Sequence, residues 1–182
     1  MVNRGYTLIE ILVAVGIFTV VIAAPTGFLV SSLKGQQKAL SSQELVDGVS
    51  FSLEYMSRAI RMAKKDLAGF CITQDMNYET TRGGKGIKFK NYEGVCHEFF
   101  WDTDNTLKEV KDTGFPVALT SNDLEVVSFK FGPDGSWDQN DNEQPQITLF
   151  LEVKGIKSQK PELQPQIKIQ TTISQRNLDV TY

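Results

Sequence analysis

The hydrophobic pattern begins with an apolar segment close to the N-terminus. Residues 11–30 contain no charged side chain. At about 1.5 Å per residue, a helix over this segment is about 30 Å long, which matches the hydrocarbon thickness of a bilayer. The pattern therefore predicts a membrane-spanning helix. Pro25 and Gly27 near its far end predict a kink or an unwound turn within residues 24–28, because proline removes a helical hydrogen bond.

A second helical pattern follows, and it is apolar on one side only. Its apolar residues recur at alternating intervals of three and four, which is the period of one helix face. They are Val46, Val49, Leu53, Met56, Ile60, Ala63 and Leu67. Gly69 is suited to end this helix, and the polar residues 31–42 before it predict an exposed neck. The amphipathic helix needs an apolar surface against which to pack.

The opposite face of the amphipathic helix carries charge. Glu54 and Arg58 are spaced four residues apart and predict an ion pair. Arg58, Arg61, Lys64 and Lys65 form a basic set. Such a set suits phospholipid head groups, DNA or a partner subunit, and it equally suits a helix face that is simply solvated.

After Gly69 the pattern alternates with a period of two, which is typical of strands. Runs rich in β-branched and aromatic residues predict strands at residues 87–89, 95–101, 124–131, 146–153 and 166–174. Turn-forming residues separate these runs at 83–84, 91–94, 102–106 and 133–135. The order of elements predicts an α+β fold. One long N-terminal helix, transmembrane in its first half and amphipathic in its second, packs on a C-terminal antiparallel β-sheet head.

Composition narrows the range of functions. A chain of 182 residues that is 41% hydrophobic can form one core with an appended helix. The net charge of −3 gives no general attraction to nucleic acid, and we expect no nucleic-acid partner. With one histidine, His97, and two cysteines, there is no zinc-binding spacing, and no nucleotide-binding or serine-hydrolase motif is present. The sequence predicts no enzymatic activity.

Glu10 is the unusual residue of the apolar segment. A carboxylate at the centre of a membrane helix costs about 2.5 to 3.5 kcal/mol, and less near an end. A cleavable secretory signal would use Ala23 and Ala24 as its small-residue site, but it leaves Glu10 unexplained and places Pro25 first in the mature chain. A simple membrane anchor also leaves Glu10 unexplained. Glu10 therefore calls for a partner.

The sequence Gly5-Tyr6-Thr7-Leu8-Ile9-Glu10, followed by Ile11-Leu12-Val13, resembles the class III signal of type IV pilins and type II secretion pseudopilins. The resemblance implies that prepilin peptidase removes residues 1–5 by cleavage between Gly5 and Tyr6. It also implies N-methylation of Tyr6, where the family more often has phenylalanine. The new amino group at Tyr6 is then a partner for Glu10, within one chain or between neighbours. Glu10 would set the register between neighbouring helices.

The resemblance also implies an organisation and a location. The expected parts are a leader at 1–5, a transmembrane and assembly helix at 6–30, a neck with an amphipathic helix at 31–69, and a β-sheet head at 70–182. Subunits of this family look like a ladle, and they cross the inner membrane once with an extracytoplasmic head before they enter a pilus or pseudopilus. The implied partners are prepilin peptidase, other pilin or pseudopilin subunits, the inner-membrane assembly platform and the lipid bilayer.

Residues 126–153 resemble a narrower group, the J-type minor pseudopilins and the W-type minor pilins. The shared pattern is an apolar strand, an Asp-Gly turn, a tryptophan, a polar loop ending in proline, and a second apolar strand. In this chain these are Phe129-Lys130-Phe131, Asp134-Gly135, Trp137, Pro145 and Ile147-Thr148-Leu149. The chain departs from the pattern at Gln144, where leucine is common, and lacks a second tryptophan in the loop.

The two cysteines suit an exported head. Cys71 and Cys96 follow the membrane segment, on the side where thiols are oxidised. A disulfide between them would close a loop of about 26 residues and stabilise the fold by about 3 to 4 kcal/mol. Two buried free thiols are the alternative. His97 follows Cys96, but neighbouring strand residues point to opposite faces, so the pair is not a catalytic dyad.

One acidic loop is a candidate metal site. Asp134, Asp138, Asn140 and Asp141 supply the hard oxygen ligands that calcium prefers. The loop does not fit the EF-hand template, because Gln139 stands at the glycine position. A solvated loop with acidic turn residues is the alternative, and no other cofactor is expected.

The resemblance implies a structural function, as a minor subunit of a type IV pilus or a type II secretion pseudopilus that primes assembly or lies at the tip. One alternative is a membrane-tethered extracytoplasmic binding module or enzyme that uses the apolar helix only as a tether. Another is a subunit of pilin fold whose head serves adhesion or DNA uptake.

Overall fold

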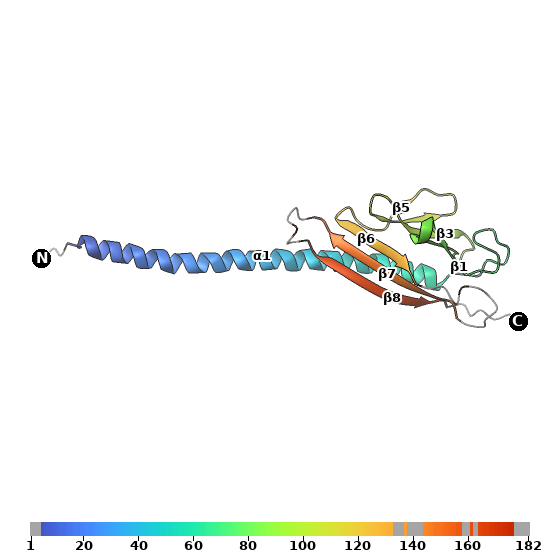
Figure 1. The fold of residues 1–182 in the computed structure, drawn as a ribbon, viewed down its shortest axis with the longest axis horizontal. Helices are drawn as coiled ribbons and strands as arrows, with labels where there is room; N and C mark the ends of the chain where they lie inside the picture. Colours follow the sequence, from blue (N-terminus) through green and yellow to red (C-terminus); the bar gives the residue numbers. More distant parts are fainter. Residues whose placement is uncertain (1–4, 133–136, 138–143, 158–160, 162–163, 177–182) are drawn as a thin grey trace. The chain divides into compact units, whose positions relative to one another are not determined.

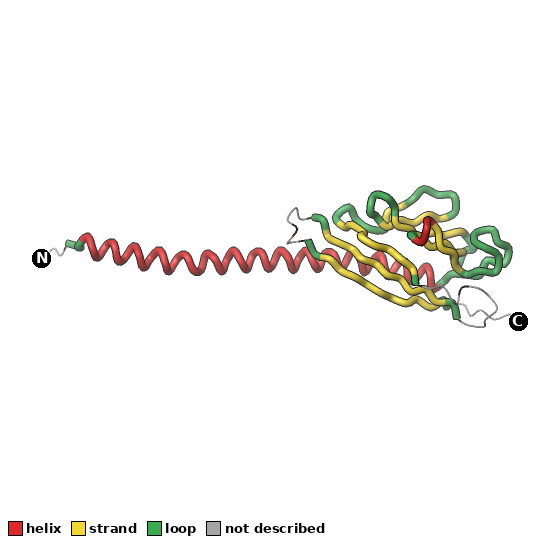
Figure 2. The backbone as a smooth tube through the Cα atoms, viewed as in Figure 1, coloured by secondary structure: helices red, strands yellow, loops and turns green. Residues whose placement is uncertain are grey.

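The computed structural model describes residues 5–132, 137, 144–157, 161 and 164–176. The chain divides into two units, Met1–Leu40 and Ser41–Tyr182, which we describe separately. Figures 1 and 2 show the elements in chain order. They are α1 (Leu8–Arg61), β1 (Tyr78–Thr81), η1 (Arg82–Gly84), β2 (Gly86–Lys90), β3 (Cys96–Trp101), β4 (Leu107–Lys111), β5 (Val117–Ala118), β6 (Leu124–Phe131), β7 (Gln146–Gly155) and β8 (Gln166–Ser174).

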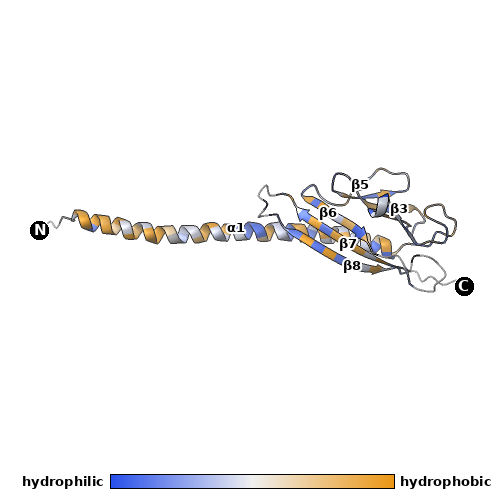
Figure 3. Cartoon of the chain, viewed as in Figure 1, coloured by the Kyte–Doolittle hydropathy of each residue, from blue (hydrophilic) through white to orange (hydrophobic). Residues whose placement is uncertain are grey.

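In the first unit, α1 is helical and apolar. Figure 3 shows hydrophobic residues gathered in this part of the helix. Within the described residues, α1 is the one helix long and apolar enough to cross a membrane. The hydroxyls of Thr19 and Thr26 each donate to the carbonyl four residues back, at 2.7 Å. Because these hydroxyls bond within the helix, they carry little cost in an apolar surrounding.

The helix runs without interruption through Pro25 and Gly27. The unwound turn predicted within residues 24–28 is therefore wrong, and a kink of the continuous helix there stays a prediction. Proline costs one hydrogen bond, and the neighbouring turns keep the helix continuous across that gap.

The second unit contains two antiparallel sheets. The five-stranded sheet has the order β1-β2-β3-β4-β5, and the three-stranded sheet has the order β6-β7-β8. In the first sheet Phe89 pairs with His97. In the second, Phe131 pairs with Leu149, and Leu149 pairs with Thr171. The predicted α+β fold, a long N-terminal apolar helix followed by a C-terminal antiparallel part, is confirmed.

All five predicted strands are present, as β2, β3, β6, β7 and β8. Three strands were missed. They are β1 and β4, which are short and rich in polar residues, and β5, which has two residues, Val117 and Ala118. Pairing with β2 and β3 holds β1 and β4 in place, so tertiary context and not local propensity makes them strands.

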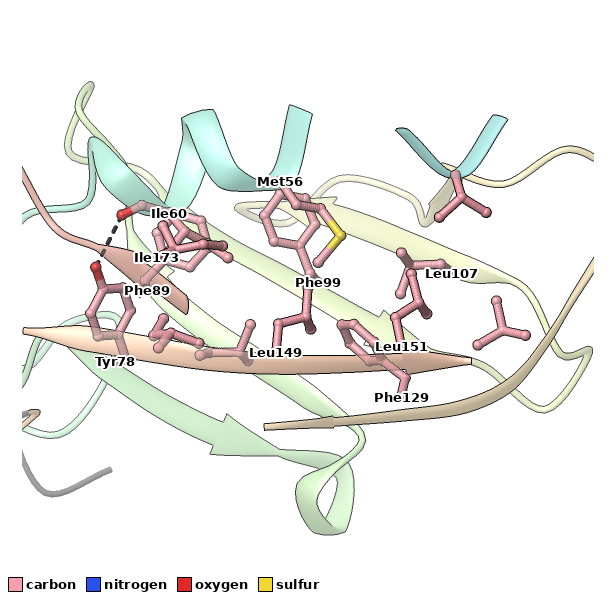
Figure 4. Close-up of a cluster of buried hydrophobic side chains, with 14 of the residues drawn as sticks. Met56, Ile60, Tyr78, Phe89, Phe99, Leu107, Phe129, Leu149, Leu151 and Ile173 are labelled. Atoms are coloured by element: carbon pink, nitrogen blue, oxygen red, sulfur yellow. Dashed lines mark hydrogen bonds between the residues drawn. The ribbon is translucent and has the colours of Figure 1, made fainter. Parts of the chain in front are cut away.

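The core of the second unit lies between the last turns of α1 and the two sheets (Figure 4). Met56 and Ile60 of α1 are fully buried, as are Phe99 of β3 and Leu149 of β7. The hydroxyl of Tyr78 donates to the carbonyl of Ile60 at 3.0 Å, so this buried hydroxyl has a partner. All members of the core cluster lie between Leu45 and Ile173.

The buried face of α1 differs from the predicted stripe at both ends. Val46 and Leu67 are 44% and 66% exposed. The buried helix residues and the residue that follows are Leu45, Val49, Ser52, Met56, Ile60 and Ala63. Their mean spacing is about 3.6 residues, the period of a straight helix, whereas the predicted stripe assumed about 3.5 and drifts away from the core.

The helix also ends earlier than predicted. α1 stops at Arg61, and the backbone amide of Lys64 then bonds the carbonyl of Lys90 at 2.8 Å. Gly69 lies in a later turn with φ of +68° instead of capping the helix. Two residues that follow β8 complete the helix end. The amide of Arg176 donates to Arg61 O at 2.7 Å, and Gln175 Nε2 donates to Ala63 O at 3.0 Å.

Candidate processing and assembly site

The bond between Gly5 and Tyr6 lies outside the helix. Residues 5–7 are not helical and α1 begins at Leu8. Tyr6 is 80% exposed. A Cβ placed on Gly5 would meet no atom within 4 Å, so packing among the described residues does not require glycine there. The bond is accessible to a peptidase, and a requirement for glycine would have to come from that enzyme.

Thr7 forms the cap of the helix. The carbonyl of Thr7 accepts from the amides of Glu10 at 3.1 Å and Ile11 at 3.3 Å. The hydroxyl of Thr7 also accepts from the Glu10 amide, at 3.4 Å. This is the N-cap arrangement, in which a side-chain oxygen satisfies an amide that lacks a partner within the helix. We did not predict a role for Thr7, although the capping-box spacing of Thr7 and Glu10 carries that signal.

Glu10 is the acidic residue of the first turn of α1. The helix dipole favours a carboxylate there. Its neighbours Ile9 and Ile11 are 70% and 52% exposed, so the carboxylate is set in an apolar surface. No hydrogen bond or ion pair joins its side chain to another residue of the described part of the chain. The structure thus places Gly5, Tyr6 and Glu10 within the first turn and the residues before it, with the carboxylate available to a partner.

Residues 1–24 match the family described as the prokaryotic N-terminal methylation motif. Comparisons with curated proteins and with solved structures gave no match. The matched segment contains Gly5, Tyr6, Thr7 and Glu10. Together with the apolar helix and the antiparallel sheets, this motif makes the chain similar to type IV pilin-like proteins. The resemblance of residues 126–153 to the J-type and W-type subunits stays a prediction.

The cysteines of the head form the predicted disulfide. Cys71 and Cys96 are bonded, with their Cα atoms 5.3 Å apart. The bond ties the loop after α1 to the start of β3. Cys96 therefore has no free thiol, which removes it as a nucleophile beside His97.

The buried side chain of Asp66 holds the loop after α1 that contains Cys71. Its side chain is fully buried, and its Oδ2 accepts from the amides of Cys71 at 2.6 Å and Ile72 at 3.3 Å. Lys90 lies 3.4 Å from its other oxygen. Burial by itself raises the pKa of Asp66, but the hydrogen bonds and Lys90 outweigh it and hold the pKa below its usual value. The sequence offered no pattern that singles out Asp66.

His97 lies on a strand, as predicted, and is buried, at 2% exposure. Its Nε2 lies 2.8 Å from Glu109 Oε2. That oxygen also accepts from the Tyr55 hydroxyl at 2.7 Å, and Lys111 Nζ donates to the same hydroxyl at 2.8 Å. Burial lowers the pKa of His97, against the opposing effect of Glu109. These four side chains join α1 to β3 and β4 and have a structural role.

The basic set Arg58, Arg61, Lys64 and Lys65, at the end of α1 and just after it, is mostly solvated. Arg58 pairs with Glu54 at 2.7 Å, as the spacing predicted, and both side chains are largely exposed. Arg61 and Lys64 are exposed too. An exposed ion pair of this kind contributes about 0.3 to 0.5 kcal/mol.

The calcium candidates Asp134, Asp138, Asn140 and Asp141 lie outside the described residues, so calcium binding there stays a prediction. Elsewhere, in the part of the chain that the structure covers, no group of three or more histidine, cysteine, aspartate or glutamate residues is arranged to hold a metal ion. Trp137, between the undescribed stretches of this loop, is buried, and its Nε1 donates to Gln146 O at 2.7 Å.

Proposed function

We propose that this protein is a minor structural subunit of a type IV pilus or a type II secretion pseudopilus. The observation that carries the proposal is the arrangement at the start of α1. An accessible Gly5–Tyr6 bond precedes a capped apolar helix whose first turn holds the unpaired Glu10. The match of residues 1–24 to the methylation motif supports the same function.

Processing supplies the group that Glu10 lacks. Cleavage by prepilin peptidase between Gly5 and Tyr6 creates an α-amino cation on Tyr6, which N-methylation leaves basic. In lipid, a buried charge without a partner is strongly unfavourable, and an ion pair removes most of that cost. The amino group of a neighbouring subunit meets Glu10 at one axial offset only, so the pair selects the register of assembly.

The cellular course follows from this chemistry. The subunit waits in the inner membrane, anchored by the first part of α1 with its head outside the cytoplasm. The assembly platform then extracts it into the fibre, where the apolar helix exchanges lipid for the helices of other pilin subunits. The resemblance of residues 126–153 to minor subunits supports low copy number and a place at the tip, where the subunit primes assembly. The function is structural and needs no catalytic group.

The experiment that tests the proposal is an intact-mass measurement of the protein extracted from membranes. The expected mass lacks residues 1–5 and carries one added methyl group. A Gly5→Leu variant should keep its full length and should not enter fibres. A chain that begins at Met1 in the wild type, or at Pro25, contradicts the proposal.

The Gly5→Leu variant also distinguishes a pilin-like subunit from the rival class of function. A tethered enzyme or binding module uses the helix only as an anchor, so Gly5→Leu would leave its activity and location unchanged. Loss of fibre assembly by Gly5→Leu, with the head still folded and exported, is the outcome that only a pilin-like subunit gives.

A further inference from the structure

A cavity lies between the last turns of α1 and the loop that joins β2 to β3. Its volume is about 380 Å³, within the range of about 300 to 1,000 Å³ that is typical of small-molecule sites. Tyr55 and Ala59 of α1 line it, as does Met62 just after the helix. Tyr92 of the β2–β3 loop lines it too, and we call this cavity the Tyr92 pocket.

The Tyr92 pocket is open to solvent although much of its wall is apolar. The side chains of Tyr55, Ala59 and Met62 are half-buried, and Tyr92 is 56% exposed. Covering such side chains with an apolar group is favourable, because it removes apolar area from water. The wall therefore favours a ligand with an apolar group, such as an aromatic ring.

The charged side chains that line the Tyr92 pocket are two cations and one carboxylate. They are Arg58, Lys111 and Glu93. The excess of positive charge favours an anionic ligand. Arg58 already has an exposed partner, Glu54, at 2.7 Å, so Lys111 is the cation that we assign to the ligand.

Lys111 has a donor left for a ligand. Its Nζ donates to the Tyr55 hydroxyl at 2.8 Å and lies 3.6 Å from Glu109 Oε2. An ammonium group has three N–H donors, so these two contacts leave one, and the side chain is 50% exposed. The pKa of Tyr92 is raised, mainly by its hydrogen bond to Glu93, and the charge of Lys111 opposes this effect. The ammonium group thus acts on the β2–β3 loop from its place in β4.

Asn91 supplies a second donor from a nearly buried side chain, which is 5% exposed. Its Oδ1 accepts from the amides of Glu93 at 3.0 Å and Val95 at 2.9 Å, and these two bonds fix the orientation of the side-chain amide. Within the described residues, no hydrogen bond reaches its Nδ2. This atom is not one of the sealed side-chain atoms that lack a partner, so it is accessible in the Tyr92 pocket, which Asn91 lines.

We propose that the Tyr92 pocket binds a ligand that joins an apolar group, about the size of one aromatic ring, to a carboxylate. Asn91 Nδ2 and Lys111 Nζ donate to the carboxylate, and the apolar group covers Ala59 and Met62. A free aromatic acid has this chemistry, and so does the C-terminal aromatic residue of a polypeptide. Binding of such a ligand goes beyond the proposed role as a structural subunit and does not rest on it.

Titration of the full-length protein in detergent tests the proposal, with a fluorinated phenylpropanoate as the probe and fluorine NMR as the measurement. A probe of this size should bind with a Kd of about 1 mM or tighter. The matching fluorinated phenylpropanol has the same ring without the charge, and it should bind at least about tenfold more weakly. Equal binding of the acid and the alcohol, or binding of neither, would overturn the proposal.

Two variants test the donors. Asn91→Asp keeps an oxygen for the amides of the loop and replaces Nδ2 by an acceptor, so it should weaken binding of the acid about tenfold or more. Lys111→Met removes the ammonium group and should have a similar effect. The matched controls Asn105→Asp and Lys130→Met change residues that do not line the pocket and should bind the acid as wild type does. Normal binding by both Asn91→Asp and Lys111→Met, with the folded state verified by thermal unfolding, contradicts the assignment.

A filled pocket tests the place of binding. Ala59→Trp puts an indole into the Tyr92 pocket and should abolish binding of the acid. Val46→Trp, on an exposed part of α1 outside the pocket, should leave binding unchanged. Undiminished binding by a folded Ala59→Trp variant would place the acid elsewhere and sink the proposal. If Ala59→Trp does not fold, Asn91→Asp decides the question.

Competition identifies the source of the carboxylate. A short peptide that ends in phenylalanine with a free carboxylate displaces the fluorinated acid if the natural ligand is a polypeptide C-terminus. Failure of that peptide, while the fluorinated acid binds, assigns a free acid. Equal displacement by the amidated peptide would contradict the need for a carboxylate. Gly5→Leu and Glu10→Ala should bind the acid normally, so a failure of the assembly proposal and a failure of this one are distinguishable.

Discussion

The hydroxyl of Thr7 accepts a hydrogen bond from the backbone amide of Glu10 at 3.4 Å. The residue that starts the helix is therefore linked to the acidic residue of its first turn. Cleavage after Gly5 would leave this cap inside the mature chain, with Tyr6 just before it. The mature subunit thus keeps its own helix start, and the position of Glu10 does not depend on the leader.

Removing the cap should loosen the first turn. Thr7→Ala deletes the hydroxyl acceptor and should destabilise the helix start by about 1 kcal/mol. Hydrogen exchange at the amides of the first turn, measured on the full chain in detergent, should speed up about fivefold. Thr7→Ser keeps an acceptor and serves as the matched control. Equal exchange in Thr7→Ala and wild type would mean that the cap contributes nothing.

Removing the carboxylate of Glu10 should affect fibre assembly without affecting the subunit held in the membrane. Glu10→Ala should leave processing at Gly5 and membrane insertion intact, since it removes a polar group from an apolar helix. Fibre assembly should fall strongly, because the neighbouring Tyr6 amine loses its partner. Intact mass reports processing, and the subunit content of sheared fibres reports assembly.

Two further variants test whether the loss of fibre assembly is caused by the loss of the negative charge of Glu10. Glu10→Gln keeps the shape and should behave like Glu10→Ala, whereas Glu10→Asp keeps the charge and should retain part of the assembly. Normal fibres from Glu10→Ala would refute the register role.

His97 should make the stability of the head dependent on pH. Burial holds its pKa in the folded state below the ordinary value of 6.5. As pH falls through 6.5, the unfolded chain therefore takes up the proton first, and the free energy of unfolding decreases until the pH reaches the folded pKa. Thermal unfolding of the head between pH 7.5 and pH 5 measures the loss.

The control for this dependence is His97→Gln, which keeps a hydrogen-bond donor for Glu109 but does not titrate. Its baseline stability should be lower, and its loss between pH 7.5 and pH 5 smaller. Asp66 has a lowered pKa and contributes acid sensitivity only near and below its ordinary value of 3.8, so the two windows are distinct. Identical pH profiles for His97→Gln and wild type would exclude His97 as the source.

The disulfide should stabilise the head substantially. Cys71→Ser should lower the free energy of unfolding by about 3 kcal/mol, measured by urea unfolding in detergent. Cys96→Ser should cost the same, and the double variant should cost no more than either single one, because each substitution breaks the same bond. Additive losses would mean that the two residues contribute mainly through other contacts.

Periodicity predicted the elements of this protein better than their ends. The strands with alternating β-branched residues, such as β7 and β8, were found because one face of each packs on the core. β4 was missed since its polar residues become a strand only through pairing with β3. The helix ends at Arg61, earlier than predicted, because the chain turns there and Lys64 bonds to Lys90. No residue near the helix end predicts that bond from the sequence.

The N-terminal site was more predictable than the interior of the head. Gly5, Tyr6 and Glu10 form one short motif, so a linear sequence suffices to recognise them. The cluster of Tyr55, His97 and Glu109 joins three elements that are distant in the chain, and only the tertiary fold brings its members together.

The hydrogen bonds from Arg176 and Gln175 to the end of α1 affect the timing of folding. The end of α1 and the residues just after it are synthesised more than one hundred residues before their partners, since Gln175 and Ala63 are separated by 112 positions. Contacts this distant in sequence form late. A nascent chain therefore exposes an unfinished helix end until Gln175 and Arg176 have been synthesised. A chain truncated before Gln175 would therefore leave the carbonyls of Arg61 and Ala63 without these donors.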